Sequence, residues 1–141
     1  MGSPPINKSM TALYPEARKR LEAWMLAANK AFPQLRITIG ETRRTLARQQ
    51  WLYAQGRTRR GLVVTFTLDS NHRLGCAADF VIVRRLTPWF AIWDSRVWNT
   101  VFERVPPARY GLERLSFEMP HLQLMQSEIS KLRAAGKLVQ T

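Results

Sequence analysis

Residues 77–83 read AADFVIV, a nearly continuous apolar run with the length and composition of a β-strand that is buried on both faces. Only Asp79 interrupts the run. An ionised carboxylate in such surroundings is strongly unfavourable unless a cation or several hydrogen-bond donors compensate its charge. The run therefore predicts a central strand, and Asp79 predicts a positively charged group beside that strand.

The segments before this strand predict two helices and another strand. Apolar residues recur at spacings of three and four from Pro15 to Ala31, as on the buried face of a helix. Residues 35–39 alternate between apolar and polar, which is the period of a half-buried strand, and Gly40 closes the segment. A second helix is expected from Thr45 to Gln55, with Gly56 as its C-terminal cap.

The other segments complete an α+β fold class, in which helices pack on a small, mainly antiparallel sheet. Residues 63–66 and 117–124 are expected to be extended, and residues 127–135 to form a short helix. A third helix is expected to begin at Thr87 and Pro88, because these types suit a helix cap and a first helical residue. Nearby tryptophans are interpreted as packing residues rather than as a platform for stacking sugars: Trp89, Trp93 and Trp98.

Composition limits the choice of fold and compartment. The length of 141 residues suits a single domain, with its core over about residues 10–136. Cys76 is the only cysteine, so no intramolecular disulfide can form. No apolar run of about 18 residues occurs, and residues 1–9 lack the apolar stretch of a signal peptide, so synthesis in the cytoplasm is expected. The net charge of +12 favours a polyanionic partner, whether nucleic acid, an anionic membrane surface or a cell-wall polymer.

Two histidines and two acids form a candidate metal site. His72 precedes Asp79 by seven residues, and Gly75 between them suits a tight turn that brings the histidine back to the strand. His121, the other histidine of the chain, follows Glu118 by three residues. Two histidines and one carboxylate leave a position open for water, as in catalytic zinc sites. We therefore expect one zinc ion per chain, with Glu118 as the base that takes a proton from the water.

The spacing of Glu118 and His121 raises a geometric difficulty. Residues three apart point to opposite faces of a regular strand, yet both side chains must reach one site. Pro120 lies between them and removes a hydrogen-bond donor from the strand. The segment is therefore expected to bend or to form a bulge.

These residues carry a family resemblance. Residues 70–79, SNHRLGCAAD, resemble the Ser-x-His-x-x-Gly-x-Ala-x-Asp motif of the peptidoglycan zinc peptidases, which include D-alanyl-D-alanine carboxypeptidases and phage L-alanyl-D-glutamate endolysins. Residues 118–121, EMPH, resemble the second element of that family. Residues 41–45, 48–49 and 52–58 resemble its endolysin-like branch, so that the likeness covers about residues 39–124.

The resemblance implies a role for each matched residue. It assigns the zinc ligands to His72, Asp79 and His121, and the base to Glu118. Arg44 would steady the substrate oxyanion, although Arg43 is the alternative because it stands where the family commonly has an aromatic residue. The implied substrate-binding residues are Ser70, Arg43 and Gln49. Cys76 has no base in its local sequence, so it is interpreted as a buried residue and not as a nucleophile.

The function implied by the resemblance is hydrolysis of the peptidoglycan stem peptide between L-alanine and D-glutamate. The alternatives are a D-alanyl-D-alanine carboxypeptidase and, in a different class, a basic module that binds nucleic acid or another polyanion through a fold with a degenerate site. We expect a monomer that has no separate wall-binding domain and does not insert stably into membranes. Its basic surface is expected to hold an anionic envelope polymer rather than nucleic acid, after release through a holin-type lesion.

Overall fold

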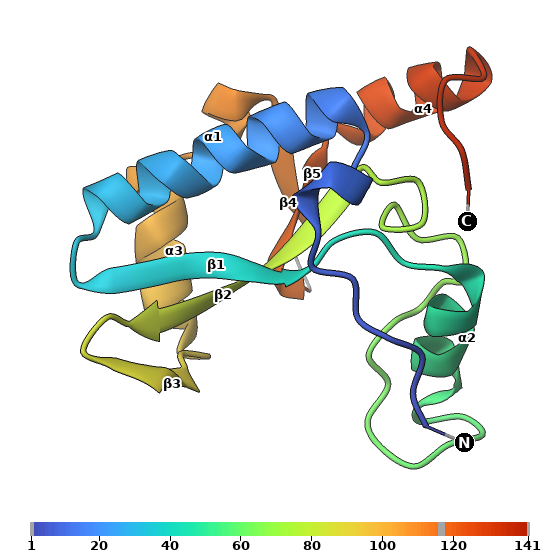
Figure 1. The fold of residues 1–141 in the computed structure, drawn as a ribbon, viewed down its shortest axis with the longest axis horizontal. Coiled ribbons are helices and arrows are strands. Elements are labelled where there is room, and N and C mark those ends of the chain that lie inside the picture. The colour runs from blue at the N-terminus through green and yellow to red at the C-terminus, as the bar shows by residue number, and fades with distance from the viewer. Residues whose placement is uncertain (1, 116–117, 141) are drawn as a thin grey trace.

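The computed structural model describes residues 2–115 and 118–140, and for Glu118 and Met119 it describes the backbone only. The chain forms one compact α+β domain (Figure 1). Its helices are α1 (Pro15–Ala31), α2 (Leu46–Ala54), α3 (Ser95–Arg104) and α4 (Gln126–Ala134), with short 3₁₀ turns η1 (Met10–Ala12) and η2 (Pro107–Tyr110). Its strands are β1 (Leu35–Glu41), β2 (Ala77–Arg84), β3 (Thr87–Ala91), β4 (Leu112–Leu115) and β5 (Glu118–Leu124).

Strand β2 is the centre of the sheet. The order within the described residues is β1-β2-β5-β4, and every pairing is antiparallel. β1 follows one edge of β2, while β5 and β3 share the other edge at opposite ends: β5 pairs with residues 77–79 and β3 with residues 83–84. At about 3.3 Å per residue, Asp79 and Arg84 are roughly 17 Å apart along the strand. β2 therefore has a site end and a hairpin end.

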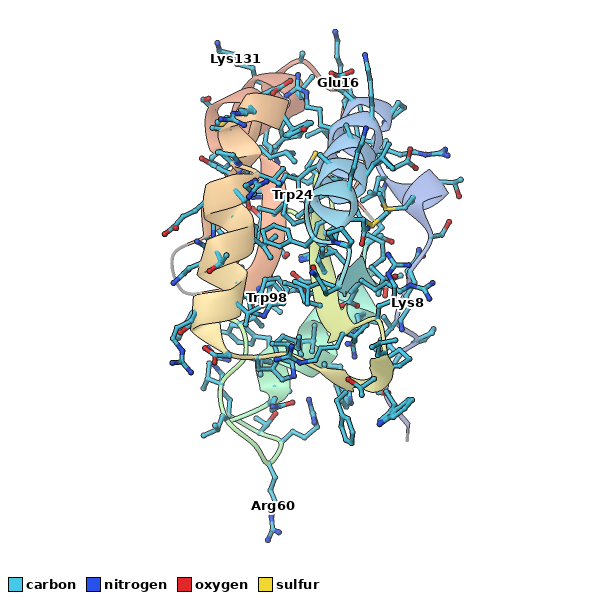
Figure 2. The ribbon with its side chains drawn as sticks, turned by 90° about the vertical axis from the view of Figure 1, so that its left-hand side faces the viewer. Lys8, Glu16, Trp24, Arg60, Trp98 and Lys131 are labelled. Carbon is cyan, nitrogen blue, oxygen red and sulfur yellow. The ribbon has the colours of Figure 1, made fainter. Side chains whose placement is uncertain are left out.

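One face of the sheet carries the hydrophobic core beneath α1 and α3. Ala78, Phe80 and Ile82 of β2 are buried on this face. Trp24 of α1 and Trp98 of α3 are fully buried (Figure 2), and the ring of Phe102 lies near both, with centroids 5.4 Å from Trp24 and 6.0 Å from Trp98. Each indole N–H is satisfied by a backbone carbonyl, since Trp24 donates to Val105 (2.9 Å) and Trp98 to Ile92 (2.7 Å). Asp79 lies on the opposite face of β2, away from this core.

Most of the expected elements are confirmed. α1 runs from Pro15 to Ala31 as predicted, and its buried residues are on the predicted face. α2 begins after Thr45, whose hydroxyl accepts from the amide of Arg48 (3.1 Å), and the following Gly56 has a positive φ of 80°. Strand β1 extends one residue beyond Gly40, to Glu41. Strand β2 is more exposed than predicted, because Asp79 and Val81 on its second face are only partly buried.

Two predictions were wrong. Residues 63–66 form an irregular segment and not a strand. The third helix begins at Ser95 and not at Pro88. Asp94 caps it by accepting a hydrogen bond from the amide of Arg96 (2.9 Å). Residues 87–91 instead turn back along β2 and form strand β3. This change also corrects the interpretation of the tryptophans. Trp98 is a packing residue, but Trp89 and Trp93 are 68% and 56% exposed.

Candidate metal centre

The sheet register brings two of the predicted ligands together. Asp79 of β2 lies directly opposite His121 of β5, so both side chains project from the same face of the sheet, away from the core. His72 arrives from the loop before β2, where Gly75 has a φ of 72°. A Cβ atom at Gly75 would approach the backbone nitrogen of Tyr14 to 3.0 Å, so this turn favours glycine for both reasons. The three predicted ligands therefore converge although 49 residues separate the histidines.

The three ligand atoms form a nearly equilateral triangle. His72 Nε2 lies 3.2 Å from His121 Nδ1 and 3.3 Å from Asp79 Oδ1, and the distance from His121 Nδ1 to Asp79 Oδ1 is 3.4 Å. Ligands bonded at about 2.0–2.1 Å to a tetrahedral zinc ion lie roughly 3.3–3.4 Å from one another. The two imidazoles and one carboxylate thus fit zinc in both chemistry and spacing. Among the described residues, these three side chains form a cluster close enough to hold a metal ion.

Neighbouring oxygens set the tautomers of both histidines. His72 Nδ1 lies 2.7 Å from the carbonyl oxygen of Thr42, and His121 Nε2 lies 2.8 Å from Gln123 Oε1. Since a carbonyl oxygen only accepts hydrogen bonds, each of these ring nitrogens carries the proton. His72 Nε2 and His121 Nδ1 consequently face the triangle, and in the neutral rings they carry lone pairs there, as metal ligation requires.

Asp79 is held as a charged carboxylate. Its Oδ1 faces the two histidines, and its Oδ2 accepts from Arg44 Nη2 at 3.1 Å. Burial raises the pKa of Asp79, but when the imidazoles are protonated, the charge of His72 and hydrogen bonds from both histidines outweigh burial, so the pKa lies well below its usual value. The positive partner expected beside Asp79 is therefore Arg44, and the two imidazoles face the same carboxylate where a metal would bind.

The structure brings Arg44 to the site and directs Arg43 elsewhere. Arg44 is held by Glu41 Oε1 (2.9 Å), by Asp79 and by Gln49 Oε1 (3.2 Å), and it lines a cavity of about 210 Å³ beside His121. Arg43 donates to the backbone carbonyls of Ala12 and Val139. Of the two arginines left open by the sequence, Arg44 is therefore the one that lies beside Asp79 and lines this cavity.

Ser70 and Gln49 have different positions relative to the cavity. Ser70 lines the cavity, and its hydroxyl accepts from the backbone amide of His72 (3.2 Å). Gln49 is fully buried, and its amide group donates to the carbonyl of Thr67 (2.7 Å) while its oxygen accepts from Arg44. Gln49 thus orients Arg44 from outside the lining of this cavity, and its contact with substrate stays a prediction.

The predicted irregularity around Pro120 is confirmed. Arg114 of β4 pairs with Leu122, but the next residue, Leu115, pairs with Glu118. One step along β4 therefore faces four along β5, which is a pronounced bulge in the segment that carries His121. Glu118 begins β5, and its side chain, the predicted base, lies outside the described residues.

Cys76 lies beside the motif but is not activated. It is fully buried, and this burial raises the pKa of its thiol to about 11. A thiol must ionise to act as a nucleophile, so its environment opposes that role.

Gln123 is a site residue that the sequence reasoning missed. It is buried, and its Oε1 accepts from His121 and from Asn71 Nδ2 (3.1 Å), while its Nε2 donates to Glu113 Oε1 (3.2 Å). Strand alternation provided a signal, because residue 123 lies two positions after His121 on the same face. The carbonyl of Thr42 carried no such signal, since any residue type supplies one.

We predict that Gln123→Met weakens zinc binding by about 10-fold to 100-fold, the usual effect of removing an outer partner of a metal-bound histidine. Methionine keeps the length of the side chain but cannot hold the tautomer of His121. Competition with a chromophoric chelator measures the affinity, and the melting temperature of the metal-free protein checks the fold. Gln126→Ala is the matched control, because Gln126 accepts from Asn71 (2.9 Å) without contacting His121. Equal zinc affinity of Gln123→Met and the control would contradict the role of Gln123.

Comparison with known proteins identifies a structural relative. No family model matches the sequence, and no curated protein matches it. Among solved structures, the crystal structure of the L-Ala D-Glu endopeptidase ChiX of Serratia marcescens matches with a TM-score of 0.63. This chain has the fold of that endopeptidase. The match covers 85% of this chain and 86% of the other at 18% sequence identity, so it establishes a shared architecture over most of both chains.

Proposed function

We propose that this protein is a zinc-dependent peptidoglycan peptidase that hydrolyses the stem peptide at the bond between L-alanine and D-glutamate. The observation that carries the proposal is the triangle of His72 Nε2, Asp79 Oδ1 and His121 Nδ1, with both tautomers set for metal binding. The fold shared with an L-Ala D-Glu endopeptidase supports the choice of bond. The resemblance of residues 70–79 and 118–121 to peptidoglycan zinc peptidases supports the choice of polymer.

The chain supplies the groups that amide hydrolysis needs. Zinc bound at the triangle would polarise the scissile carbonyl and lower the pKa of a water molecule. Glu118 takes the proton of the attacking water and returns it to the leaving amine. Arg44 donates to the oxygen on which negative charge develops, and its orientation is fixed beforehand by Glu41 and Gln49. Ser70 lines the cavity from the side of the His72 loop and contacts the bound peptide there.

The masses of the products test the bond assignment. Purified peptidoglycan is digested with the zinc-loaded protein, and the soluble products are separated and weighed by mass spectrometry. Cleavage between L-alanine and D-glutamate exposes a new N-terminal D-glutamate on the released peptide. Release of free D-alanine instead would identify a D-alanyl-D-alanine carboxypeptidase. If a preparation with a full complement of zinc released no product at all, this result would contradict the peptidase assignment.

A basic polyanion-binding module is the alternative from a different class. Such a module would explain the net charge of +12. It would not explain why two histidines with fixed tautomers lie around a carboxylate. We propose that the basic surface serves polymer capture beside the peptidase site. The described residues contain no helix long and apolar enough to cross a membrane. As a separate proposal, the protein reaches the wall through a holin-type lesion.

We predict about one zinc ion per chain and a melting temperature that falls on chelation. A metal that binds only the folded state at about 100 times its dissociation constant stabilises that state by about 2.7 kcal/mol, or roughly 10 °C for a domain of this size. Elemental analysis measures the zinc content, and calorimetry before and after dialysis against a chelator measures the shift. An unchanged melting temperature after verified removal of zinc would contradict the coupling between the metal and the fold.

A further inference from the structure

The turn between β2 and β3 exposes large apolar side chains far from the metal centre. Leu86 at its tip is 91% exposed, and Trp89 and Phe90 in β3 are each 68% exposed. Trp93 follows at 56% exposure and stacks on the buried ring of Trp98, with centroids 6.1 Å apart. We name these four residues, Leu86, Trp89, Phe90 and Trp93, the apolar turn. Contiguous exposed groups of this kind mark interaction sites on soluble domains.

Backbone pairing explains why the aromatic pair is exposed. Val83 of β2 pairs with Ala91, and the adjacent Arg84 pairs with Thr87. One step along β2 therefore spans four residues of β3, so residues 88–90 lie outside the ladder in the part of the chain that the structure describes. The rings of Trp89 and Phe90 remain in contact, with centroids 6.2 Å apart. The bulge thus presents the two aromatic rings together to solvent.

Cations flank the apolar turn. Arg84 and Arg85 immediately precede Leu86, and Arg85 Nε donates to the carbonyl of Pro33 (3.0 Å) beside a hollow of about 390 Å³. No acidic residue occurs between residues 80 and 93, and the next one, Asp94, is already paired with Arg96 (2.9 Å). Two arginines therefore precede the apolar turn, and no acidic residue lies within it.

A second basic segment faces the same end of the molecule. Arg60 projects at the lower end of Figure 2, from the basic loop that follows α2. β3 lies at the lower end of Figure 1, and the two views share the vertical direction. The apolar turn and the basic loop can consequently approach one extended anionic surface together.

We propose that the apolar turn is a peripheral binding surface for an anionic phospholipid bilayer. Tryptophan and phenylalanine partition into the region between headgroups and acyl chains, and arginines beside them pair with lipid phosphates. The exposed aliphatic tip at Leu86 suits acyl chains, whereas stacking on a sugar or a base would use only the flat rings. The aromatic residues enter the interface to a shallow depth, and the association is reversible.

Vesicle sedimentation tests the apolar contribution. The zinc-loaded full chain is mixed with vesicles of phosphatidylglycerol and phosphatidylcholine, or of phosphatidylcholine alone, and the bound fraction is measured. We expect binding to the anionic vesicles only. The double variant Trp89→Ser with Phe90→Ser should weaken it by at least about tenfold, because two large apolar side chains no longer leave water. Leu26→Ser removes a side chain that is 70% exposed on α1, and it should bind as the parent protein does.

Removing the positive charges of the flanking arginines tests the electrostatic contribution. Arg84→Gln with Arg85→Gln should weaken binding by roughly 30-fold, since each arginine near an anionic surface contributes about a factor of five. Arg104→Gln with Arg109→Gln lowers the net charge equally and should have a much smaller effect. Equal losses in the two pairs, or unchanged binding of the Trp89/Phe90 variant, would overturn the proposal.

Other occupants give distinct results. The parent protein could bind sedimented peptidoglycan but no vesicles, and the Trp89/Phe90 variant could lose that binding. The surface would then bind glycan, and the proposal would be wrong. A concentration-dependent dimer that this variant abolished, again without vesicle binding, would replace the membrane with a second copy of the chain. Hydrolysis of a small soluble peptide is measured in parallel, and its loss would show damage to the fold and not to the surface.

Discussion

His121→Ala is expected to remove both zinc binding and peptidase activity. The variant deletes Nδ1, one corner of the ligand triangle, and leaves His72 and Asp79 as a two-ligand site. Removing an outer partner of a metal-bound histidine costs about 10-fold to 100-fold in affinity, so loss of the ligand itself should exceed about 100-fold. Elemental analysis after gel filtration and hydrolysis of purified peptidoglycan measure the two losses.

The metal-free variant should still fold, which makes the result interpretable. Asp79 retains its ion pair with Arg44 (3.1 Å), and the core lies on the other face of the sheet. The melting temperature of the variant should therefore be compared with that of the metal-free parent protein. Retention of stoichiometric zinc by a folded His121→Ala protein would show that the triangle is not the metal site.

The convergence of His72, Asp79 and His121 could be predicted from the sequence because each residue carried a local signal. Asp79 placed a charge in an apolar run and so indicated a positive partner. Gly75 indicated a turn beside His72, and Pro120 indicated an irregular strand next to His121. Such signals depend on residue type within a few positions. The register that places Asp79 opposite His121 then follows from ordinary antiparallel pairing of β2 with β5.

The hairpin at the other end of β2 was missed because its local signals conflicted. Thr87 and Pro88 suit a helix start, and the apolar residues after them are compatible with a helix face. Asp94 supplies a better cap seven residues later, since its carboxylate accepts from the amide of Arg96. Residues 87–91 can then pair with β2, and this choice depends on a tertiary contact that sequence spacing does not encode.

The partners that orient the ligands were predictable only in part. Gln123 follows from strand alternation once His121 is placed, but its contacts with Asn71 and Glu113 join segments that are distant in sequence. The carbonyl of Thr42 is positioned by the N-terminal segment, because Thr42 donates to the carbonyls of Asn7 (2.7 Å) and Ser9 (2.8 Å). A backbone acceptor of this kind has no signature in residue type.

Glu118→Gln separates the predicted base from the ligands. Glutamine has nearly the same size as glutamate but cannot accept the proton of the attacking water. Because Glu118 is not one of the three proposed ligands, zinc should remain bound at about one ion per chain. The turnover rate should fall by about 10² to 10⁴, the usual contribution of general acid-base catalysis. Elemental analysis and the rate of release of stem-peptide products, measured on one preparation, give both values.

Two outcomes would contradict this assignment, and each has a different consequence. Near-normal turnover would require another base, and Asp69 is the carboxylate nearest in sequence to the His72 loop. That carboxylate is disfavoured, because its two oxygens already accept from Arg133 (2.9 Å) and Gln140 (3.1 Å). Loss of zinc as complete as in His121→Ala would instead make Glu118 a ligand. Asp79 would then be an outer partner that orients His72, and Asp79→Asn should leave zinc bound, whereas the proposed triangle requires that this substitution release it.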